Sequence, residues 1–108
     1  MVERLFKVVF TRQSRKKIKE IGEYYEENAS KEVSKKVRKE IMKKGRSLER
    51  YPEGNPLMPG TEDRKEEIRY TKAWSYKIIY QVLQLKYIVK ILTVRHDKED
   101  PDKIIDDL

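Results

Sequence analysis

The sequence predicts an α+β domain in which two helices cover one face of a β-sheet. Residues 1–50 are rich in Lys, Arg and Glu, with apolar side chains at helical spacing. Residues 74–94 instead carry dense β-branched and aromatic runs that are typical of strands. A helical segment followed by consecutive strands indicates the α+β class, and the length of 108 residues fits a single domain over 1–108.

The first half of the chain predicts one strand and a helical hairpin. Residues 5–10 form the strand, because apolar side chains alternate along it, and Thr11 follows as a helix N-cap. A break at residues 28–30 separates two amphipathic helices, since Ser30 can cap the second one, and Pro52 is expected to end it. The apolar positions of the two helices are Ile18, Ile21 and Tyr25, and then Val33, Val37, Ile41 and Leu48.

The second half predicts a loop and three strands. Residues 52–63 contain three of the four prolines and two of the four glycines, and are expected to form an irregular loop. The strands that follow are expected at residues 66–71, 74–83 and 87–94. Because the connection at 84–86 is short, the last two strands should pair as a hairpin at the centre of an antiparallel sheet. Asp100 and Pro101 begin a short helical turn, which completes a β-α-α-β-β-β order.

The charge of +7 is unevenly distributed. Residues 1–50 carry 16 basic and 8 acidic side chains, a balance of +8, whereas residues 97–108 carry 2 basic and 6 acidic ones, a balance of −4. A basic domain favours partners such as RNA, DNA or an acidic protein segment. A solvated surface that keeps the protein soluble explains the same charge equally well.

Several classes of protein are disfavoured by what the sequence lacks. It has no cysteine, so a disulfide framework and a thiolate metal site are excluded, and one histidine makes any metal site improbable. No apolar run approaches the roughly 20 residues that span a bilayer, and no signal-peptide core is present. We expect a cytoplasmic protein with no cofactor and no membrane partner.

One stretch of the chain resembles a known family of toxins. Residues 75–82 read Ser-Tyr-Lys-Ile-Ile-Tyr-Gln-Val, which is similar to the Tyr-basic-aliphatic-aliphatic-Tyr strand of the RelE/ParE superfamily. The polar run at residues 95–101 (Arg-His-Asp-Lys-Glu-Asp-Pro) and the predicted order of elements are also similar to that superfamily. The resemblance implies the toxin of a type II toxin–antitoxin system, with a RelE/ParE-like fold.

The resemblance leaves the mechanism of the toxin open. RelE-like members cut messenger RNA in the ribosome, and the candidate acid and base groups of this chain favour that branch. ParE-like members inhibit DNA gyrase without catalysis, and the long helical hairpin over about residues 12–50 favours them. We expect ribosome-dependent mRNA cleavage first, with gyrase inhibition as the alternative. A non-toxic member that binds only nucleic acid or an antitoxin is the third possibility.

The resemblance implies four candidate catalytic residues. Lys77 stands where RelE-like enzymes place an arginine on the scissile phosphate, although lysine lacks its bidentate fork. Arg69 would bind phosphate and Glu67 would act as base, unless they form an ordinary cross-strand ion pair. His96 suits general acid catalysis, or is a turn residue that binds its own backbone. The C-terminal tyrosine of RelE-like enzymes is absent after Tyr87.

Further basic residues are candidates for binding RNA phosphates: Arg95, Lys72, Lys43 and Lys44. The aromatic residues Tyr24, Tyr25 and Trp74 could stack on bases, but their spacing is more typical of core or hairpin contacts. The family also implies a cognate antitoxin. An acidic, amphipathic antitoxin segment would complement the +8 half of the chain.

Overall fold

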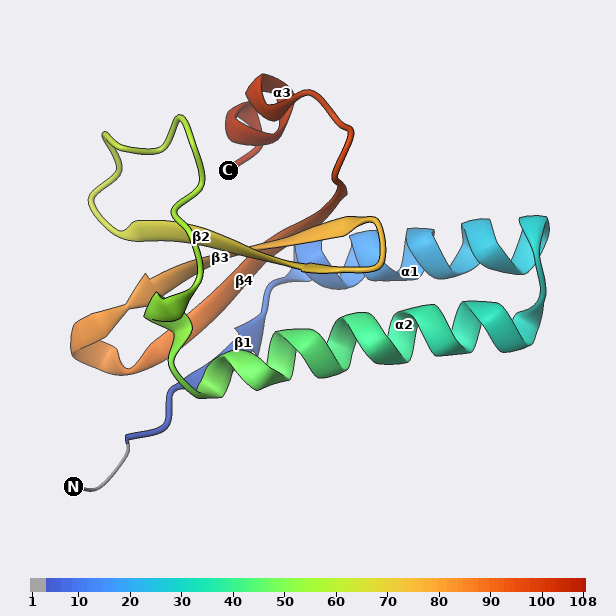
Figure 1. The fold of residues 1–108 in the computed structure, drawn as a ribbon, viewed down its shortest axis with the longest axis horizontal. Helices are drawn as coiled ribbons and strands as arrows, with labels where there is room; N and C mark the ends of the chain where they lie inside the picture. Colours follow the sequence, from blue (N-terminus) through green and yellow to red (C-terminus); the bar gives the residue numbers. More distant parts are fainter. Residues whose placement is uncertain (1–3) are drawn as a thin grey trace.

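The structure is a computed structural model in which residues 4–108 are described (Figure 1). Its strands are β1 (Lys7–Phe10), β2 (Glu67–Ala73), β3 (Tyr76–Leu83) and β4 (Ile88–His96), and its helices are α1 (Arg12–Asn28), α2 (Lys31–Arg46) and α3 (Pro101–Asp106). The predicted α+β order of strand, two helices, three strands and a helical turn is therefore confirmed. Among the described helices, none is long and apolar enough to cross a membrane.

The four strands form one sheet in the order β1-β4-β3-β2. The β3–β4 hairpin lies at the centre of the sheet, as predicted. Strand β3 pairs with both β2 and β4, and both pairings are antiparallel. β1 pairs with β4 in parallel, so the expectation of a wholly antiparallel sheet is wrong at this edge. The long helical connection after β1 explains the difference, because parallel neighbours need a crossover of a dozen or more residues.

Each helix of the hairpin begins with a capping hydrogen bond at a residue that the sequence predicts as an N-cap. The Thr11 side chain accepts a hydrogen bond from the Ser14 amide at 3.1 Å, and its hydroxyl donates to the Leu92 carbonyl of β4 at 3.0 Å. Ser30 accepts from the Val33 amide at 3.1 Å and so begins α2. Satisfied first-turn amides fix where each helix begins, and the Leu92 bond anchors α1 on the sheet.

The end of α2 differs from the prediction. The α-helix ends at Arg46, and the chain tightens into a 3₁₀ turn at Ser47–Glu49 that still buries Leu48. The Ser47 hydroxyl donates to the Lys44 carbonyl at 2.5 Å, which satisfies an end group of the helix. Pro52 instead begins a second 3₁₀ turn within the irregular loop.

The predicted strands are shifted at their ends for local reasons. Trp74 lies in the turn between β2 and β3 with a φ of 56°, so the prediction that it belongs to β3 is wrong. Tyr87 has a φ of 53° and also lies outside the strand that follows it. A left-handed residue breaks the pleat of a strand, and both predicted strands therefore begin too early.

Each face of the sheet carries a separate core. Helices α1 and α2 cover one face, and their apolar stripes, with Val37 and Ile41 fully buried, pack on Ile78 and Tyr80 of β3. The other face has a smaller core, in which Ile79 packs with residues of the irregular loop and of α3. Figure 1 shows the two long helices on one side of the sheet and α3 with the loop on the other.

Candidate functional site

Three basic residues form a row across the sheet, on the face opposite the helical hairpin. Lys72 of β2 pairs with Lys77 of β3, and Lys77 pairs with Arg95 of β4. Directly paired residues project to the same face of a sheet. Lys77 therefore lies on the same face as Ile79, two residues along β3, and away from the face that packs on α1 and α2.

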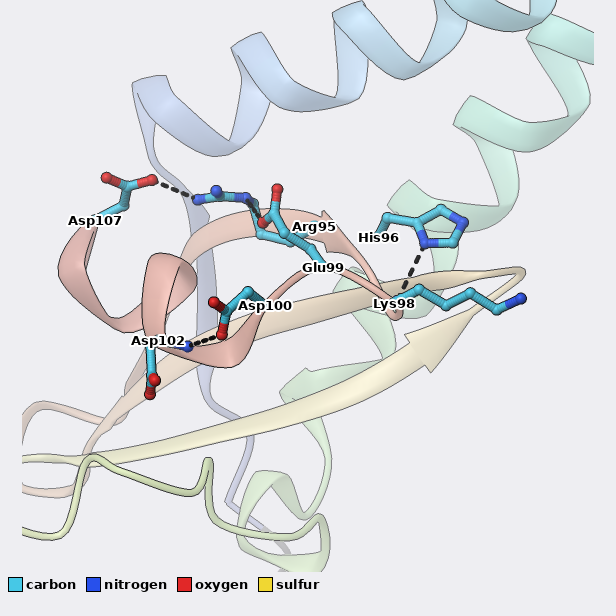
Figure 2. Close-up of polar contacts among 7 residues, drawn as sticks. All are labelled: Arg95, His96, Lys98, Glu99, Asp100, Asp102 and Asp107. Atoms are coloured by element: carbon cyan, nitrogen blue, oxygen red, sulfur yellow. Dashed lines mark hydrogen bonds and ion pairs between the residues drawn. The ribbon is translucent and has the colours of Figure 1, made fainter.

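Arg95, a predicted phosphate-binding residue, is held by carboxylates of its own chain (Figure 2). Its Nε lies 2.6 Å from Oε2 of Glu99, and one terminal nitrogen lies 2.9 Å from Oδ2 of Asp107 just after α3. Burial opposes the charged form, but hydrogen bonds and charges of the two carboxylates outweigh it and raise the pKa of Arg95. The guanidinium is thus occupied in this conformation, and it fastens the C-terminal segment to the sheet.

Lys77 is half-buried and has an aromatic neighbour. Its Nζ lies 5.2 Å from the centre of the Tyr70 ring, within the distance of a cation–π contact. Lys72 stands opposite it on the edge strand, and two like charges in direct register repel one another. An anion bound between the two ammonium groups would relieve that repulsion.

Arg69 and Glu67 lie on the other face of β2. Arg69 pairs in register with Tyr80, whose side chain belongs to the core beneath the helices. Its Nε lies 3.0 Å from Oε2 of Glu67, and it also donates a hydrogen bond to the Asn55 carbonyl of the loop. The two predicted catalytic residues therefore form an ion pair within one strand, not the cross-strand pair that was the alternative, and Arg69 also holds the loop.

His96 lies at the end of β4 on the helical face. It pairs with Tyr76, and the two rings meet edge-on with centroids 5.5 Å apart. The Lys98 amide donates to Nδ1 at 3.1 Å (Figure 2), so the neutral imidazole carries its proton on Nε2. This backbone bond is the one expected of a turn residue. A hollow of about 220 Å³ beside His96 is lined by Lys17, Glu20 and Tyr24 of α1, among others.

The structure therefore does not bring the four predicted catalytic residues together. Lys77 projects from one face of the sheet, whereas Arg69, Glu67 and His96 lie on the opposite one. Even on that face His96 is separated from the other two, because β2 and β4 are not neighbours and His96 lies at the far end of β4. Among residues 4–108 there is also no group of three or more His, Asp or Glu side chains that could hold a metal ion.

A basic groove runs along the helical hairpin, and the sequence did not predict that its residues form one surface. It has a volume of about 490 Å³, and Ile18 and Met42 contribute apolar surface between basic side chains from both helices. Those basic residues are Arg15, Lys19, Lys35, Arg38, Lys39 and Arg46. The sequence does contain a signal for this groove. Each of these residues lies three or four positions from another basic residue of its own helix, or beside the apolar stripe of that helix.

A second hollow, of about 390 Å³, gathers three of the four predicted phosphate-binding residues. Lys43 and Lys44 line it from α2, and Lys72 of the edge strand β2 lines it from the margin of the sheet. Trp74, in the turn that follows β2, also lines it. The sequence did not predict that these residues meet, because α2 and the β2–β3 turn are about 30 residues apart along the chain.

A helical hairpin over a small mixed sheet, with its basic groups on exposed surfaces, defines the class of RelE/ParE-fold toxins. A family model described as the ParE toxin of type II toxin–antitoxin systems (parDE) matches residues 8–101. This match covers most of the chain, and the chain belongs to the ParE toxin family. It is therefore a toxin of the type II toxin–antitoxin class, as the sequence motif implied.

Solved structures show the same fold at low sequence identity. A chain of the chromosomal ParDE toxin–antitoxin system from P. aeruginosa superposes with a TM-score of 0.69 at 15% identity, covering 86% of this chain and 97% of that one. A doubly substituted RelE toxin from E. coli, in its free state, superposes with a TM-score of 0.63 at 18% identity, covering 95% and 93%. No curated protein sequence matches the chain significantly.

Proposed function

We propose that this toxin arrests growth by binding DNA gyrase, and that it does not cut messenger RNA. The observation that carries the proposal is the division of the candidate acid, base and phosphate-binding residues between the two faces of the sheet. Membership of the ParE family supports the same reading, since ParE-like toxins of the superfamily inhibit gyrase.

Cleavage of RNA by its own 2′-hydroxyl places strict demands on geometry. A base and an acid must flank one phosphate, each within hydrogen-bond reach of the proton that it transfers. Lys77 and His96 project from opposite faces of the sheet, and this arrangement does not favour their meeting on one phosphate. Glu67, the proposed base, is engaged by Arg69. A toxin that acts by binding needs none of these proton transfers.

The basic groove of the hairpin supports an antitoxin partner for this chain. It presents six cations and no carboxylate, around apolar surface from Ile18 and Met42. An amphipathic segment with acidic side chains would complement both features. We assign this groove to the acidic antitoxin segment, which leaves the rest of the exposed surface for the target of the toxin.

The test examines cellular messenger RNA after the protein is induced without its antitoxin. Primer extension on several translated messages should find no new cuts while growth stops, and plasmid DNA from the same cells should lose negative supercoiling. Phased cuts inside reading frames with normal supercoiling would replace this proposal with the RelE-like one. That outcome would assign Lys72 and Lys77 to the scissile phosphate, since they form a cationic pair in direct register on the sheet.

A further inference from the structure

The hollow between α2 and the β2–β3 turn combines an exposed aromatic ring with free cations. Its residues from the helix are Glu40, Lys43, Lys44 and Ser47, and its residues from the sheet edge are Lys72, Ala73 and Trp74. Its volume of about 390 Å³ lies within the range of roughly 300–1,000 Å³ that is common for small-ligand sites. The basic hairpin groove and the gyrase proposal leave this surface without a role.

Trp74 is held in an exposed position by an unfavourable backbone conformation. Its φ of 56° lies in the left-handed region, which non-glycine residues adopt only at an energetic cost. Nevertheless 47% of the residue remains exposed. Strain of this kind persists where the surroundings over-determine it, and it gathers at sites that bind ligands. Burial of the ring does not explain why the turn carries a tryptophan.

The indole ring is also fixed in orientation. Its Nε1 donates a hydrogen bond to Oε2 of Glu40, and the Tyr25 ring meets it edge-on with centroids 6.1 Å apart. A ring held by α1 and α2 in this way forms a rigid platform that loses little entropy when a planar group stacks on it. The Glu40 carboxylate is occupied by the same bond.

The three lysines around the platform have no anionic partner. Among residues 4–108, Lys43, Lys44 and Lys72 form no ion pair, and Lys43 and Lys44 are exposed near the C-terminal end of α2. Lys72 additionally faces the like charge of Lys77. Lys43 and Lys44 come from α2 and Lys72 comes from the edge strand that leads into Trp74, so both walls of the hollow carry cations. Cationic side chains next to an aromatic ring are the combination that proteins use to bind single-stranded nucleic acid.

We propose that this hollow binds single-stranded nucleic acid, with one base stacked on Trp74 and the adjoining phosphates on Lys43, Lys44 and Lys72. A duplex hides the faces of its bases, so it cannot use the platform. An acidic peptide could use the lysines but gains nothing from a fixed, exposed indole. The combination of ring and cations therefore favours a single strand over either of them.

The protein supplies its own probe, because Trp74 is its only tryptophan. The purified chain is titrated with a 12-nucleotide oligo-dT, the matching oligo-U, a 12-base-pair duplex and poly-L-glutamate, while the indole fluorescence is recorded. Either single strand should quench the emission at saturation, and comparing the two shows whether DNA or RNA is preferred. Affinity should fall with salt with a logarithmic slope of about −2, as three phosphate contacts on a single strand require.

Substituted variants distinguish the contribution of base stacking from that of charge. Their affinity for a fluorescein-labelled oligo-dT is measured by fluorescence anisotropy. Trp74→Gly suits the left-handed backbone and should remain folded, yet bind about five- to hundredfold more weakly. Tyr51→Gly is its matched control, since Tyr51 has a φ of 53° and is 75% exposed but does not line the hollow. That control should bind as the natural chain does.

The charge control compares two triple variants with the same net charge. Alanine at Lys43, Lys44 and Lys72 should abolish most of the salt dependence and weaken binding at least tenfold. Alanine at the exposed Lys16, Lys31 and Lys36, outside the hollow, should change affinity much less. Equal losses in both triples, a duplex bound as tightly as a single strand, or the same quenching by poly-L-glutamate would each overturn the proposal. None of these results bears on gyrase inhibition, which is measured separately.

Discussion

Lys77 and His96 project from opposite faces of the sheet, although their strand positions are adjacent. Lys77 pairs with Arg95, and its neighbour Tyr76 pairs with His96. Because the side chains of a strand alternate between faces, one step along β4 is enough to send the two residues apart. A chemistry that needs both groups on one phosphate therefore has no support in this fold.

The first prediction follows from that separation. Lys77→Ala and His96→Ala should leave growth arrest within about twofold of the natural chain, because gyrase binding needs no proton transfer by either residue. The measurement is the rate of colony loss after induction, at matched protein levels. A loss of toxicity in both variants, with both proteins still folded, would favour the nuclease.

A second prediction concerns two helical glycines. A Cβ at Gly45 would lie 2.8 Å from the Phe10 ring, which packs against the core, and 2.9 Å from Cδ1 of Ile91 within the core. Gly45→Ala should therefore destabilise the fold, since overpacking costs about 1–3 kcal/mol and exceeds the helix propensity gained.

Gly22→Ala is the matched comparison. The three atoms nearest to a Cβ there all belong to the flexible, exposed side chain of Arg38, the first at 2.4 Å, and that side chain can move away. This variant should be as stable as the natural chain or up to about 1 kcal/mol more stable. Urea denaturation followed by circular dichroism ranks the two. A Gly22→Ala protein less stable than Gly45→Ala would contradict the packing described.

The third prediction concerns Tyr80, which is fully buried. Its hydroxyl donates to the Pro52 carbonyl at 2.6 Å and so holds the irregular loop on the core. Tyr80→Phe should cost about 1–3 kcal/mol in unfolding free energy, because a buried carbonyl loses its donor. Tyr51→Phe, at a residue that is 75% exposed, should cost almost nothing.

The same tyrosine predicts a dependence on alkaline pH. Burial raises the pKa of Tyr80 above its ordinary value of 10.0, so the folded state favours the neutral phenol. The stabilisation is complete below pH 10 and is lost as pH rises from there toward the pKa of the folded state. The stability advantage over Tyr80→Phe should therefore shrink above pH 10. An advantage that grows with pH would refute the assignment.

The fourth prediction tests the ion pairs that fasten α3. Asp107→Asn removes one carboxylate from Arg95, and since Asp107 is 53% exposed the loss should be about 0.5–1 kcal/mol. Amide hydrogen exchange at residues 102–106 should accelerate about two- to fivefold. Asp106→Asn serves as the control, because Asp106 forms no ion pair among the described residues. Equal acceleration in both variants would show that Arg95 does not hold the helix.

The sequence predicted the arrangement of the elements because that arrangement depends on local patterns. The N-caps Thr11 and Ser30 and the alternating strands lie where short-range chemistry places them. Its errors came from longer-range causes. The parallel pairing of β1 depends on the long crossover, and the turn at Trp74 depends on α1 and α2, which bind its ring.

The candidate site was predictable only in its residue types. Basic and acidic residues near residues 67–77 and 95–96 stand out in the sequence as polar positions within apolar strands. Which of them meet depends on register and on the alternation of faces across several strands, and single-sequence patterns do not specify register. For the same reason the meeting of Lys43, Lys44 and Lys72 beside Trp74 became visible only in the fold.

The most direct test of the central claim is a supercoiling assay with purified DNA gyrase, relaxed plasmid, ATP and this toxin, in the absence of ribosomes. The account predicts that the toxin blocks supercoiling in a dose-dependent way, and that Lys77→Ala together with His96→Ala blocks it equally well. Full gyrase activity at a toxin excess of a hundredfold would contradict the account and return Lys72 and Lys77 to the role of phosphate ligands in RNA cleavage.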